Sequence, residues 1–574
     1  MTTHQPFSNF ENLPYVRPDL AAFEREWEQC LNRFRTATSA EEQSELLAQM
    51  NAYRIELDTA ATIVSIRHSC DTSDEFYSAE QEYMDTIRPI VAERVNDLYR
   101  ALISSPYRAA LEHQWGVQLF RIAELSVRSQ SPAVIELLQR ENALATEYQK
   151  LLASAEIPFD GKTLNLSSIV PYLQHTDRAI RRAASEAKWQ YFRDHAAELD
   201  RLYDELVKVR TEIAHRLGYA SFTELGYVRM LRSDYTAADV ARYRQYVLRH
   251  IVPVAVRLRQ RQARRLGLER LTFVDEPLHY RSGNATPKGS PDWIIAQART
   301  MYAEMSPQTD EFFQLMEQRH LMDLLTRPRK ATGGYCTFLA AYGVPFIFAN
   351  FNGTAHDVDV LTHEFGHAFQ CYSSRHHRAP EYWFPTYEAC EIHSMSMEFF
   401  AWPWIKRFFG EDEDKYQFQH LSGALLFLPY AVLVDHFQHE VYNNPTMSPA
   451  ERKQCWRMLE QQYLPFRDYD GDSFLDSGVV WQQQRHIYES PFYYVDYALA
   501  QICALQFWVR AKTDRASAWS DYLELCRAGG TRSFLELVEL AHLRSPFDER
   551  SFTEIIGDIT ARLDGVPDTH FDNG

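Results

Sequence analysis

Hydrophobic side chains recur every three or four positions through the first third of this chain, a spacing that predicts helices. Alternation of the kind that marks strands is scarce between residues 19 and 206. The helical spacing is illustrated by Leu46, Met50, Tyr53 and Leu57. We therefore predict a predominantly all-α fold.

Two helix starts are marked within this region. Ser39 stands three residues before Glu42, which is the spacing of a capping box. Thr72 and Glu75 repeat that spacing. We predict a helical N-terminal lobe over residues 1–206, and we interpret it as a scaffold that shapes a cleft rather than as a separate binding module.

The rest of the chain, residues 207–574, is predicted to form a second lobe with a small sheet around residues 333–351. Two runs, 335–339 and 344–351, are rich in β-branched and aromatic residues and flank a short glycine-containing turn, which predicts a hairpin or two adjacent strands. Pro345 has no amide hydrogen, so it favours an edge strand or a strand start. An edge strand there could pair with an extended peptide, although an ordinary edge strand explains the pattern equally well.

The pentapeptide His-Glu-Phe-Gly-His at residues 363–367 carries the strongest chemical signal. On a helix, His363 and His367 face the same way, so both can bind one zinc ion, and Glu364 between them can reach a water on that metal. The alternative is a pair of hydrogen-bonded core histidines. Two features favour the metal site: the intervening glutamate, and Gly366, which allows another part of the chain to approach the helix closely.

The helix that carries this motif is predicted to begin just after a turn at Asn352. Thr354 or His356 is its candidate N-cap, and Asp357 and Asp359 are placed favourably in the first turn. Apolar residues on one face predict that the helix is largely buried.

A catalytic zinc needs a third protein ligand and one open position. Thr386 can cap a downstream helix that continues to Phe400 and is stopped by Pro403. That helix is mostly apolar, so a carboxylate within it is costly unless it meets a metal or a donor. Four residues of the helix are candidate ligands. These arguments rank Glu391 and Glu398 above Glu388 and His393. His376 and His377 are interpreted as part of a solvated loop.

The composition limits the class of protein and its compartment. With 45% hydrophobic and 24% charged residues, the chain is globular rather than disordered or fibrous. A formal charge of −18 argues against nucleic acid or an anionic membrane as a partner. The longest apolar segment, residues 424–434, is too short to span a bilayer. The chain shows no secretory signal and its 8 cysteines form no C-x-x-C pair, so we predict a soluble, cytoplasmic protein with reduced thiols. Nothing in the sequence indicates an oligomeric state.

Residues 363–398 resemble the thimet-oligopeptidase-like zinc peptidases, most closely their oligoendopeptidase F and Pz-peptidase branch. In that family a glutamate beyond the second histidine binds the metal and is followed by a serine and a further glutamate, a pattern that Glu391, Ser394 and Glu398 match. The resemblance implies that Glu391 is the third ligand and that Glu398 orients a ligating imidazole. Many relatives have another histidine where this chain has Gln370.

A second block, residues 481–498, also resembles the family. Ser490 and Pro491 predict a helix start there. Three phenols would share one arc of that helix: Tyr493, Tyr494 and Tyr497. Such an arc is more typical of core packing when taken alone. The resemblance implies instead that His486 and a tyrosine hold the substrate and its oxyanion, and it leaves the choice of tyrosine open.

Together these features predict a zinc oligoendopeptidase with one Zn²⁺ per chain, in which two helical lobes enclose a deep channel that admits short peptides. Glu364 would act as the general base. The substrate backbone is expected to lie along the predicted edge strand, with contacts at Phe346, Phe348 and Asn350. A zinc carboxypeptidase or dipeptidase is the nearest alternative, and a non-catalytic peptide-binding zinc protein is a more distant one.

Overall fold

The structure is a computed structural model that describes residues 7–571, and helices make up most of it. The helices of the first half are α1 (Leu20–Thr36), α2 (Ala40–Cys70), α3 (Glu75–Ile103), α4 (Arg108–Trp115), α5 (Val117–Ser129), α6 (Ile135–Ala153), α7 (Val170–Leu173), α8 (Arg178–Asp194), α9 (Ala196–Arg216), α10 (Phe222–Arg229), α11 (Ala237–Tyr246) and α12 (Val252–Leu266). The later helices are α13 (Pro291–Met305), α14 (Pro307–Gln318), α15 (His356–Ser374), α16 (Tyr387–Phe400), α17 (Lys406–Phe409), α18 (Glu413–Asn443), α19 (Pro449–Tyr463), α20 (Ser473–Asp476), α21 (Arg485–Glu489), α22 (Tyr494–Thr513), α23 (Arg515–Ala528), α24 (Phe534–Leu540) and α25 (Glu549–Asp564). The strands are β1 (Ile157–Phe159), β2 (Lys162–Leu164), β3 (Met322–Leu325), β4 (Tyr335–Leu339) and β5 (Val344–Phe351).

The predicted strands are present as β4 and β5, which pair antiparallel in a three-stranded sheet of order β3-β5-β4. Because β3 pairs with the other side of β5, β5 is the central strand and β4 lies at the edge. The expectation that the strand with Pro345 is an edge strand is therefore wrong. Pro345 stands second in β5, opposite Phe338, so its missing amide hydrogen falls at the strand start, the other place where proline is tolerated.

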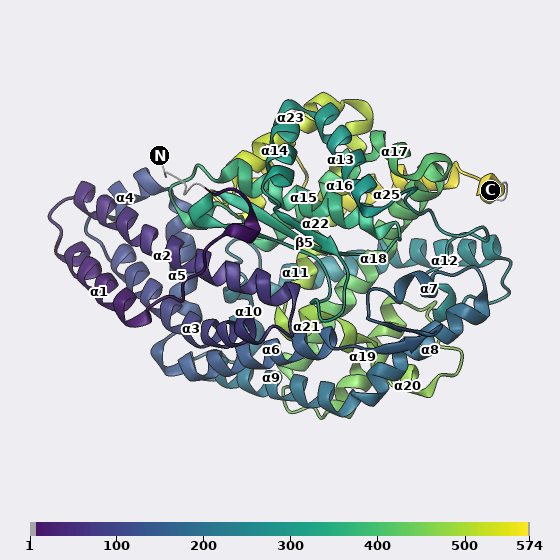
Figure 1. The fold of residues 1–574 in the computed structure, drawn as a ribbon, viewed down its shortest axis with the longest axis horizontal. Helices are drawn as coiled ribbons and strands as arrows, with labels where there is room; N and C mark the ends of the chain where they lie inside the picture. The colour runs from purple at the N-terminus through teal and green to yellow at the C-terminus, as the bar shows by residue number, and fades with distance from the viewer. Residues whose placement is uncertain (1–6, 572–574) are drawn as a thin grey trace.

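Helices are stacked against one face of this sheet. α15 packs on β4 and β5, α16 packs on α15, and α22 packs on α16. In Figure 1 the sheet lies at the centre, with α13 to α16 and α22 above it and α6, α9 and α19 below it. The helix that carries the pentapeptide is thus held between the sheet and a second buried helix, which fixes its position on both sides.

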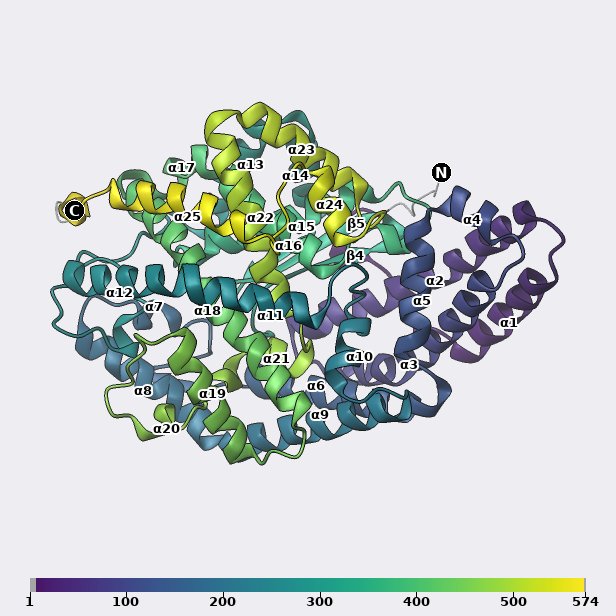
Figure 2. The ribbon, with the colours of Figure 1, turned by 180° about the vertical axis from the view of Figure 1, so that it is seen from behind.

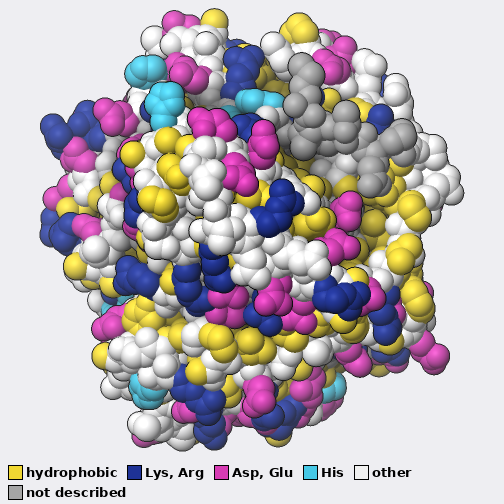
Figure 3. All heavy atoms as spheres, turned by 90° about the vertical axis from the view of Figure 1, so that its left-hand side faces the viewer, with side chains coloured by type: hydrophobic (Ala, Val, Ile, Leu, Met, Phe, Trp, Pro, Cys, Tyr) yellow, Lys and Arg dark blue, Asp and Glu magenta, His cyan; other side chains and the backbone are white. Residues whose placement is uncertain are grey.

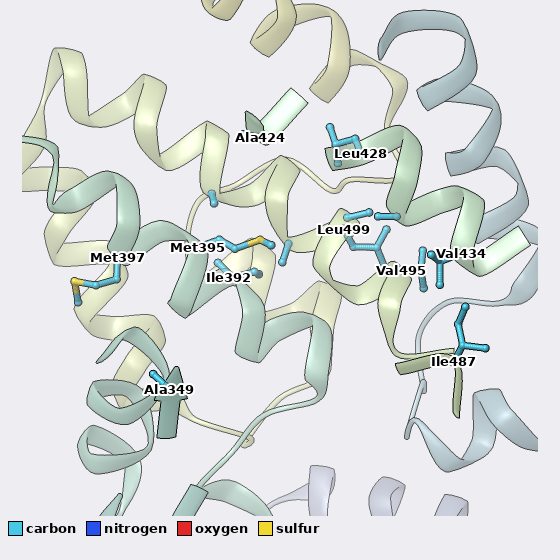
Figure 4. Close-up of a cluster of buried hydrophobic side chains, with 14 of the residues drawn as sticks. Ala349, Ile392, Met395, Met397, Ala424, Leu428, Val434, Ile487, Val495 and Leu499 are labelled. Atoms are coloured by element: carbon cyan, nitrogen blue, oxygen red, sulfur yellow. The ribbon is translucent and has the colours of Figure 1, made fainter. Parts of the chain in front are cut away.

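Buried apolar side chains join α16 to α22. Figure 4 shows Ile392 and Met395 from α16 near Val495 and Leu499 from α22, with Leu428 of α18 beside them. All five are buried. The prediction for α16 is confirmed in its bounds, since it runs from Tyr387 to Phe400 and ends before Pro403.

Several predicted helix starts are displaced. Ser39 caps α2 as expected, but the cap of α3 is Asp74 rather than Thr72. Ala355 stands at the cap of α15 without a side-chain hydrogen bond, so neither Thr354 nor His356 fills that role. Asp357 instead accepts hydrogen bonds from the amides of the preceding turn, 2.8 Å from the nitrogen of Asn352.

The expected helix start at Ser490 and Pro491 is also wrong. Ser490 ends α21, and its amide donates to the carbonyl of His486. α22 begins only at Tyr494. Between the two helices Phe492 has a φ of +68°, a left-handed conformation that no helix can continue through.

The helices α1 to α5 form a separate hydrophobic cluster around Trp27 and Phe34, which Ala379 and Tyr382 join from the second half of the chain. These helices form one end of the molecule, and the C-terminus lies at the other, as Figures 1 and 2 both show. Residue 206, the predicted lobe boundary, falls inside α9, whose buried side chains share one large core with the second half of the chain. The packing is therefore continuous at that position.

Within the described residues, one stretch, Lys406–Asn443, is apolar and long enough to cross a membrane by length and composition. However, 67% of its apolar window is buried inside the fold. Its hydrophobic side chains therefore pack against neighbouring helices such as α22 and α19. On the face drawn in Figure 3, acidic and basic side chains are interspersed.

Candidate metal centre and active site

Three predicted ligands converge between α15 and α16. Nε2 of His363 lies 3.2 Å from Oε2 of Glu391, and Nε2 of His367 lies 3.3 Å from the same oxygen. A zinc ion with ligands about 2.0–2.1 Å away in a tetrahedron separates those ligands by roughly 3.3 Å. The spacing and the donor types therefore fit a divalent metal of the zinc kind, and within residues 7–571 this is the one His, Cys, Asp or Glu cluster of metal-binding geometry.

Glu398 lies behind the first histidine. Its Oε1 is 2.7 Å from Nδ1 of His363, and its Oε2 is 2.8 Å from Nε2 of His420. Burial opposes the charge on this carboxylate, but the hydrogen bonds with the two histidines outweigh it and lower the pKa of Glu398 to about 2. A fixed anion at Nδ1 leaves Nε2 of His363 free to bind a metal.

The hydroxyl of Ser394 makes the matching contact on the third ligand, donating to Oε2 of Glu391 at 2.8 Å. His420 was not among the predicted residues. It comes from α18, and no motif connects it to the pentapeptide, so only the folded chain reveals it.

Glu364 is buried beside the ligands, and its Oε2 has no hydrogen-bond partner. Burial raises the pKa of Glu364 above its ordinary value. Gly334, just before β4, leaves room for this side chain, since a Cβ at Gly334 would lie 3.1 Å from its Oε1. A carboxylate with a raised pKa and an unpaired oxygen is suited to accept a proton in the cavity.

His486, from α21, lines the same two cavities as Glu364. Burial, assisted by the charge of Arg485, lowers the pKa of His486 to about 4, so the ring is neutral near pH 7. The side-chain amide nitrogen of Gln484 lies 2.9 Å from Nδ1 of His486, and an amide nitrogen can only donate. The ring hydrogen therefore resides on Nε2, which donates to the hydroxyl of Tyr497 at 3.0 Å.

The three tyrosines of the predicted arc have different surroundings. Tyr493 donates its hydroxyl hydrogen to Oε1 of Glu391. Tyr497 accepts from His486, which leaves its own hydroxyl hydrogen available. Tyr494 lines a different part of the cavity, beside Phe427 and Tyr430.

Two cavities of about 730 and 530 Å³ meet at the metal ligands. Both are lined by His363, Glu364, His486 and Tyr497, so these groups stand at the junction. A third, polar cavity of about 390 Å³ lies along Tyr335, Cys336 and Thr337 of β4. These three residues of β4 also line the larger cavity at the metal ligands.

The expected substrate strand needs correction. Phe346 and Phe348 are buried in the central strand β5, which is paired on both sides, so no peptide can add to it. The side-chain amide of Asn350 is also occupied, because it donates to the carbonyls of Ala331 and Gly333 at 2.9 and 2.8 Å. β3 and β4 are the edge strands, and residues of β4 line the cavity at the metal ligands.

The lower-ranked candidates lie away from the metal centre. His393 is buried with its Nδ1 on the carbonyl of Ala389, His376 is exposed, and His377 is half-buried with its Nε2 on the carbonyl of Arg527. Gln370 is buried and donates to the carbonyl of Trp383 at 3.0 Å. Burial raises the pKa of the Cys336 thiol, which keeps it protonated and unreactive.

Comparison with known proteins agrees with this site. Residues 10–130 match the Peptidase M3 N-terminal domain, and residues 305–555 match Peptidase family M3. A crystal structure assigned to oligoendopeptidase F is 54% identical, with a TM-score of 0.97 over 98% of this chain and 100% of that one. A structure of Pz peptidase A with an inhibitor is 52% identical, also with a TM-score of 0.97, over 98% of this chain and 100% of that one. Oligopeptidase PepF of Bacillus subtilis (strain 168) is 20% identical over 552 residues, which are 88% of this chain and 78% of that protein.

The fold and the site thus define a metallo-endopeptidase, a hydrolase of peptide bonds, as predicted. The chain belongs to peptidase family M3. Family membership implies a bound metal, and the His-His-Glu group is able to hold one.

Proposed function

We propose that this protein is a zinc-dependent oligoendopeptidase that cleaves internal bonds of short, unstructured peptides in the cytoplasm. The observation that carries the proposal is the junction of the two cavities, where a buried Glu364 and the pair His486 and Tyr497 line both cavities beside three metal ligands. A structural zinc site has four protein ligands and no need for such groups. The names of the relatives, oligopeptidase and oligoendopeptidase F, support the same substrate class.

His363, His367 and Glu391 would hold the ion. When bound, zinc would act as a Lewis acid that lowers the pKa of a water to about 7 and polarises the scissile carbonyl. Glu364 accepts the proton of the attacking water through its unpaired oxygen and then delivers it to the leaving amine. Its raised pKa suits both steps, because the group must bind the proton and release it again.

Tyr497 donates to the carbonyl oxygen as negative charge develops there. The neutral ring of His486 fixes the phenol by donating to its oxygen, so the hydroxyl hydrogen points into the cavity. One preorganised donor of this kind contributes about 3 kcal/mol to transition-state stabilisation. Tyr493 is assigned to orienting Glu391, with which its hydroxyl is already bonded.

The substrate backbone pairs with the free edge of β4, which leads from the polar cavity to the metal centre. Main-chain pairing needs an extended segment, so a folded protein is excluded while a short peptide is admitted. A cytoplasmic location agrees with the 8 cysteines, all of which are free thiols.

A peptide ladder, incubated with the protein and analysed by mass spectrometry with and without a chelator, tests the proposal. We expect internal cuts that disappear with chelation and return when zinc is added. Removal of one or two residues from an end would indicate a carboxypeptidase or dipeptidase instead. Glu364→Gln is expected to retain one zinc per chain and to lose turnover, and near-wild-type turnover would remove Glu364 from the role of base.

A further inference from the structure

The connection between α21 and α22 is tightly anchored although it belongs to neither helix. α21 carries His486, Tyr493 is the last residue of the link, and Tyr497 lies in the first turn of α22. Figures 1 and 2 both show α21 in the lower half of the molecule and α22 in the upper half, so the short link crosses between them. The relative position of these three side chains depends on residues 490–493.

The left-handed residue Phe492 stands at the centre of this link. Its amide donates to Oε1 of Gln438 at 2.9 Å, and its carbonyl accepts from Nη2 of Arg232 at 2.6 Å. Its ring lies directly on Gly226 of α10, where an added Cβ would lie 2.4 Å from a ring carbon. Both backbone groups and the side chain are therefore held by residues distant in sequence.

Arg232 holds two parts of the link together. The same Nη2 that binds the carbonyl of Phe492 also donates to Oδ1 of Asp496 at 2.7 Å. The guanidinium side chain is 0% exposed and stacks over the ring of Tyr227 at 4.3 Å. A planar, permanently charged group on a rigid stack fixes both acceptors, which a flexible ammonium could not do equally well.

Acidic side chains near Arg232 lie on α16 as well as on α22. Glu388, one turn before the ligand Glu391 on α16, is buried and neither of its carboxylate oxygens has a hydrogen-bond partner. Burial and the neighbouring acid raise the pKa of Glu388 to about 8, and burial raises that of Asp496 to about 7. The charge of Arg232 acts on both acids in the opposite direction and lowers the pKa of each, which places it near α16 as well as α22.

We propose that Arg232 is a positioning residue for the peptidase reaction, which by clamping Phe492 and Asp496 holds the hydroxyl of Tyr497 and the ring of His486 in the cavities that Glu364 also lines. The inference rests on the proposed function. Arg232 touches neither substrate nor metal in this scheme and acts only through the two anchored residues.

The test compares Arg232→Lys with wild type in zinc content, thermal unfolding, kcat and KM. We expect one zinc per chain, a KM changed by less than about threefold, and a kcat lowered by at least about tenfold, since small misplacement of a catalytic group is costly. In a Tyr497→Phe background, adding Arg232→Lys should lower kcat by a further factor of less than about two, because the hydroxyl that Arg232 positions is already lost. An equal loss in both backgrounds, or a folded variant with wild-type kcat, would overturn the proposal.

Two further variants separate positioning from simple destabilisation. Gly226→Ala pushes the ring of Phe492 without altering any charge and should lower kcat in the same selective way. Arg181→Lys alters another buried ion pair, with Asp275, on the distant helix α8, and should leave kcat unchanged.

A crystal structure of Arg232→Lys gives a readout that needs no activity. A lengthened contact between His486 and Tyr497 supports the proposal, and an unchanged contact contradicts it. If wild type fails to hydrolyse peptides, the proposed function fails, while this structure still decides whether Arg232 fixes the link.

Discussion

Gly366 lies so close to Ser394 that a Cβ added to the glycine would be 2.7 Å from the Cα of Ser394. The carbonyl oxygen of His393 would be equally near, at 2.7 Å. Both atoms are backbone of α16 and cannot move without moving the helix. The glycine of the pentapeptide therefore sets the separation between the helix with the two histidines and the helix with Glu391.

Gly366→Ala is accordingly expected to weaken zinc binding at least about tenfold, because the two ligand-bearing helices must move apart. Competition with a fluorescent zinc chelator measures the affinity. The control is Gly557→Ala on the helix α25, where no atom lies within 4 Å of the added carbon. That change should stabilise the protein by up to about 1 kcal/mol through helix propensity and leave zinc affinity unaltered. Unchanged affinity in Gly366→Ala would contradict the packing argument.

Glu398→Gln should reduce zinc affinity by about 10- to 100-fold, since the amide cannot supply the negative charge that holds His363 in its ligating form. Isothermal titration of the metal-free protein measures it. His420→Asn removes the contact of His420 with Oε2 of Glu398 but leaves the contact of Glu398 with His363. It should therefore reduce zinc affinity by a smaller factor. If Glu398→Gln binds zinc as tightly as wild type, the hydrogen bond has no role in ligation.

The tyrosines can be ranked by single phenylalanine substitutions. Tyr497→Phe should lower kcat by about 100-fold with little change in KM, because its hydroxyl meets the substrate only as charge develops. Tyr493→Phe should act instead on zinc affinity, through the lost contact with Glu391. Tyr494→Phe serves as the control and should retain kcat within about threefold, and steady-state kinetics with one peptide substrate distinguishes the three outcomes.

A buried histidine far from the site should make the protein acid-sensitive. His68 on α2 is 1% exposed, its Nε2 has no hydrogen-bond partner, and burial lowers its pKa to about 4. A histidine in the unfolded chain has a pKa of about 6.5. Between this pKa and the lower pKa of the folded protein, the unfolded state binds more protons, so the free energy of unfolding falls as the pH falls. Between pH 8 and pH 5 this loss amounts to about 2 kcal/mol. Urea unfolding at both pH values should show that His68→Gln loses less stability on acidification than wild type, and equal losses would exclude His68 as a cause.

The local elements of this fold were predictable because periodicity and capping act over a few residues. The two strands, the bounds of α16 and the same-side arrangement of His363 and His367 all depend on such spacing. The ranking of Glu391 and Glu398 above Glu388 and His393 rested on one helical face and the cost of burying a carboxylate. The choice between the first two came from the family resemblance, and the folded chain places Glu391 with the histidines and Glu398 behind one of them.

The errors fall where partners are distant in sequence. Pro345 indicated an edge strand or a strand start, and only the second is correct, because β3, which comes from more than a dozen residues earlier, pairs with β5 and makes it central. Ser490 and Pro491 had the local pattern of a helix start, yet Gln438 and Arg232 hold Phe492 in a conformation that delays α22 to Tyr494. Long-range contacts outweighed a weak local preference in both cases.

The sequence by itself thus determined the chemistry of this protein, since a histidine pair with an intervening glutamate is complete within two turns of one helix. The tertiary structure decided everything that requires a second element: the contact of His420 with Glu398, the position of β4 at a sheet edge beside the cavity, and the contact of His486 with Tyr497. These depend on packing between segments far apart along the chain, whose energies no local pattern records.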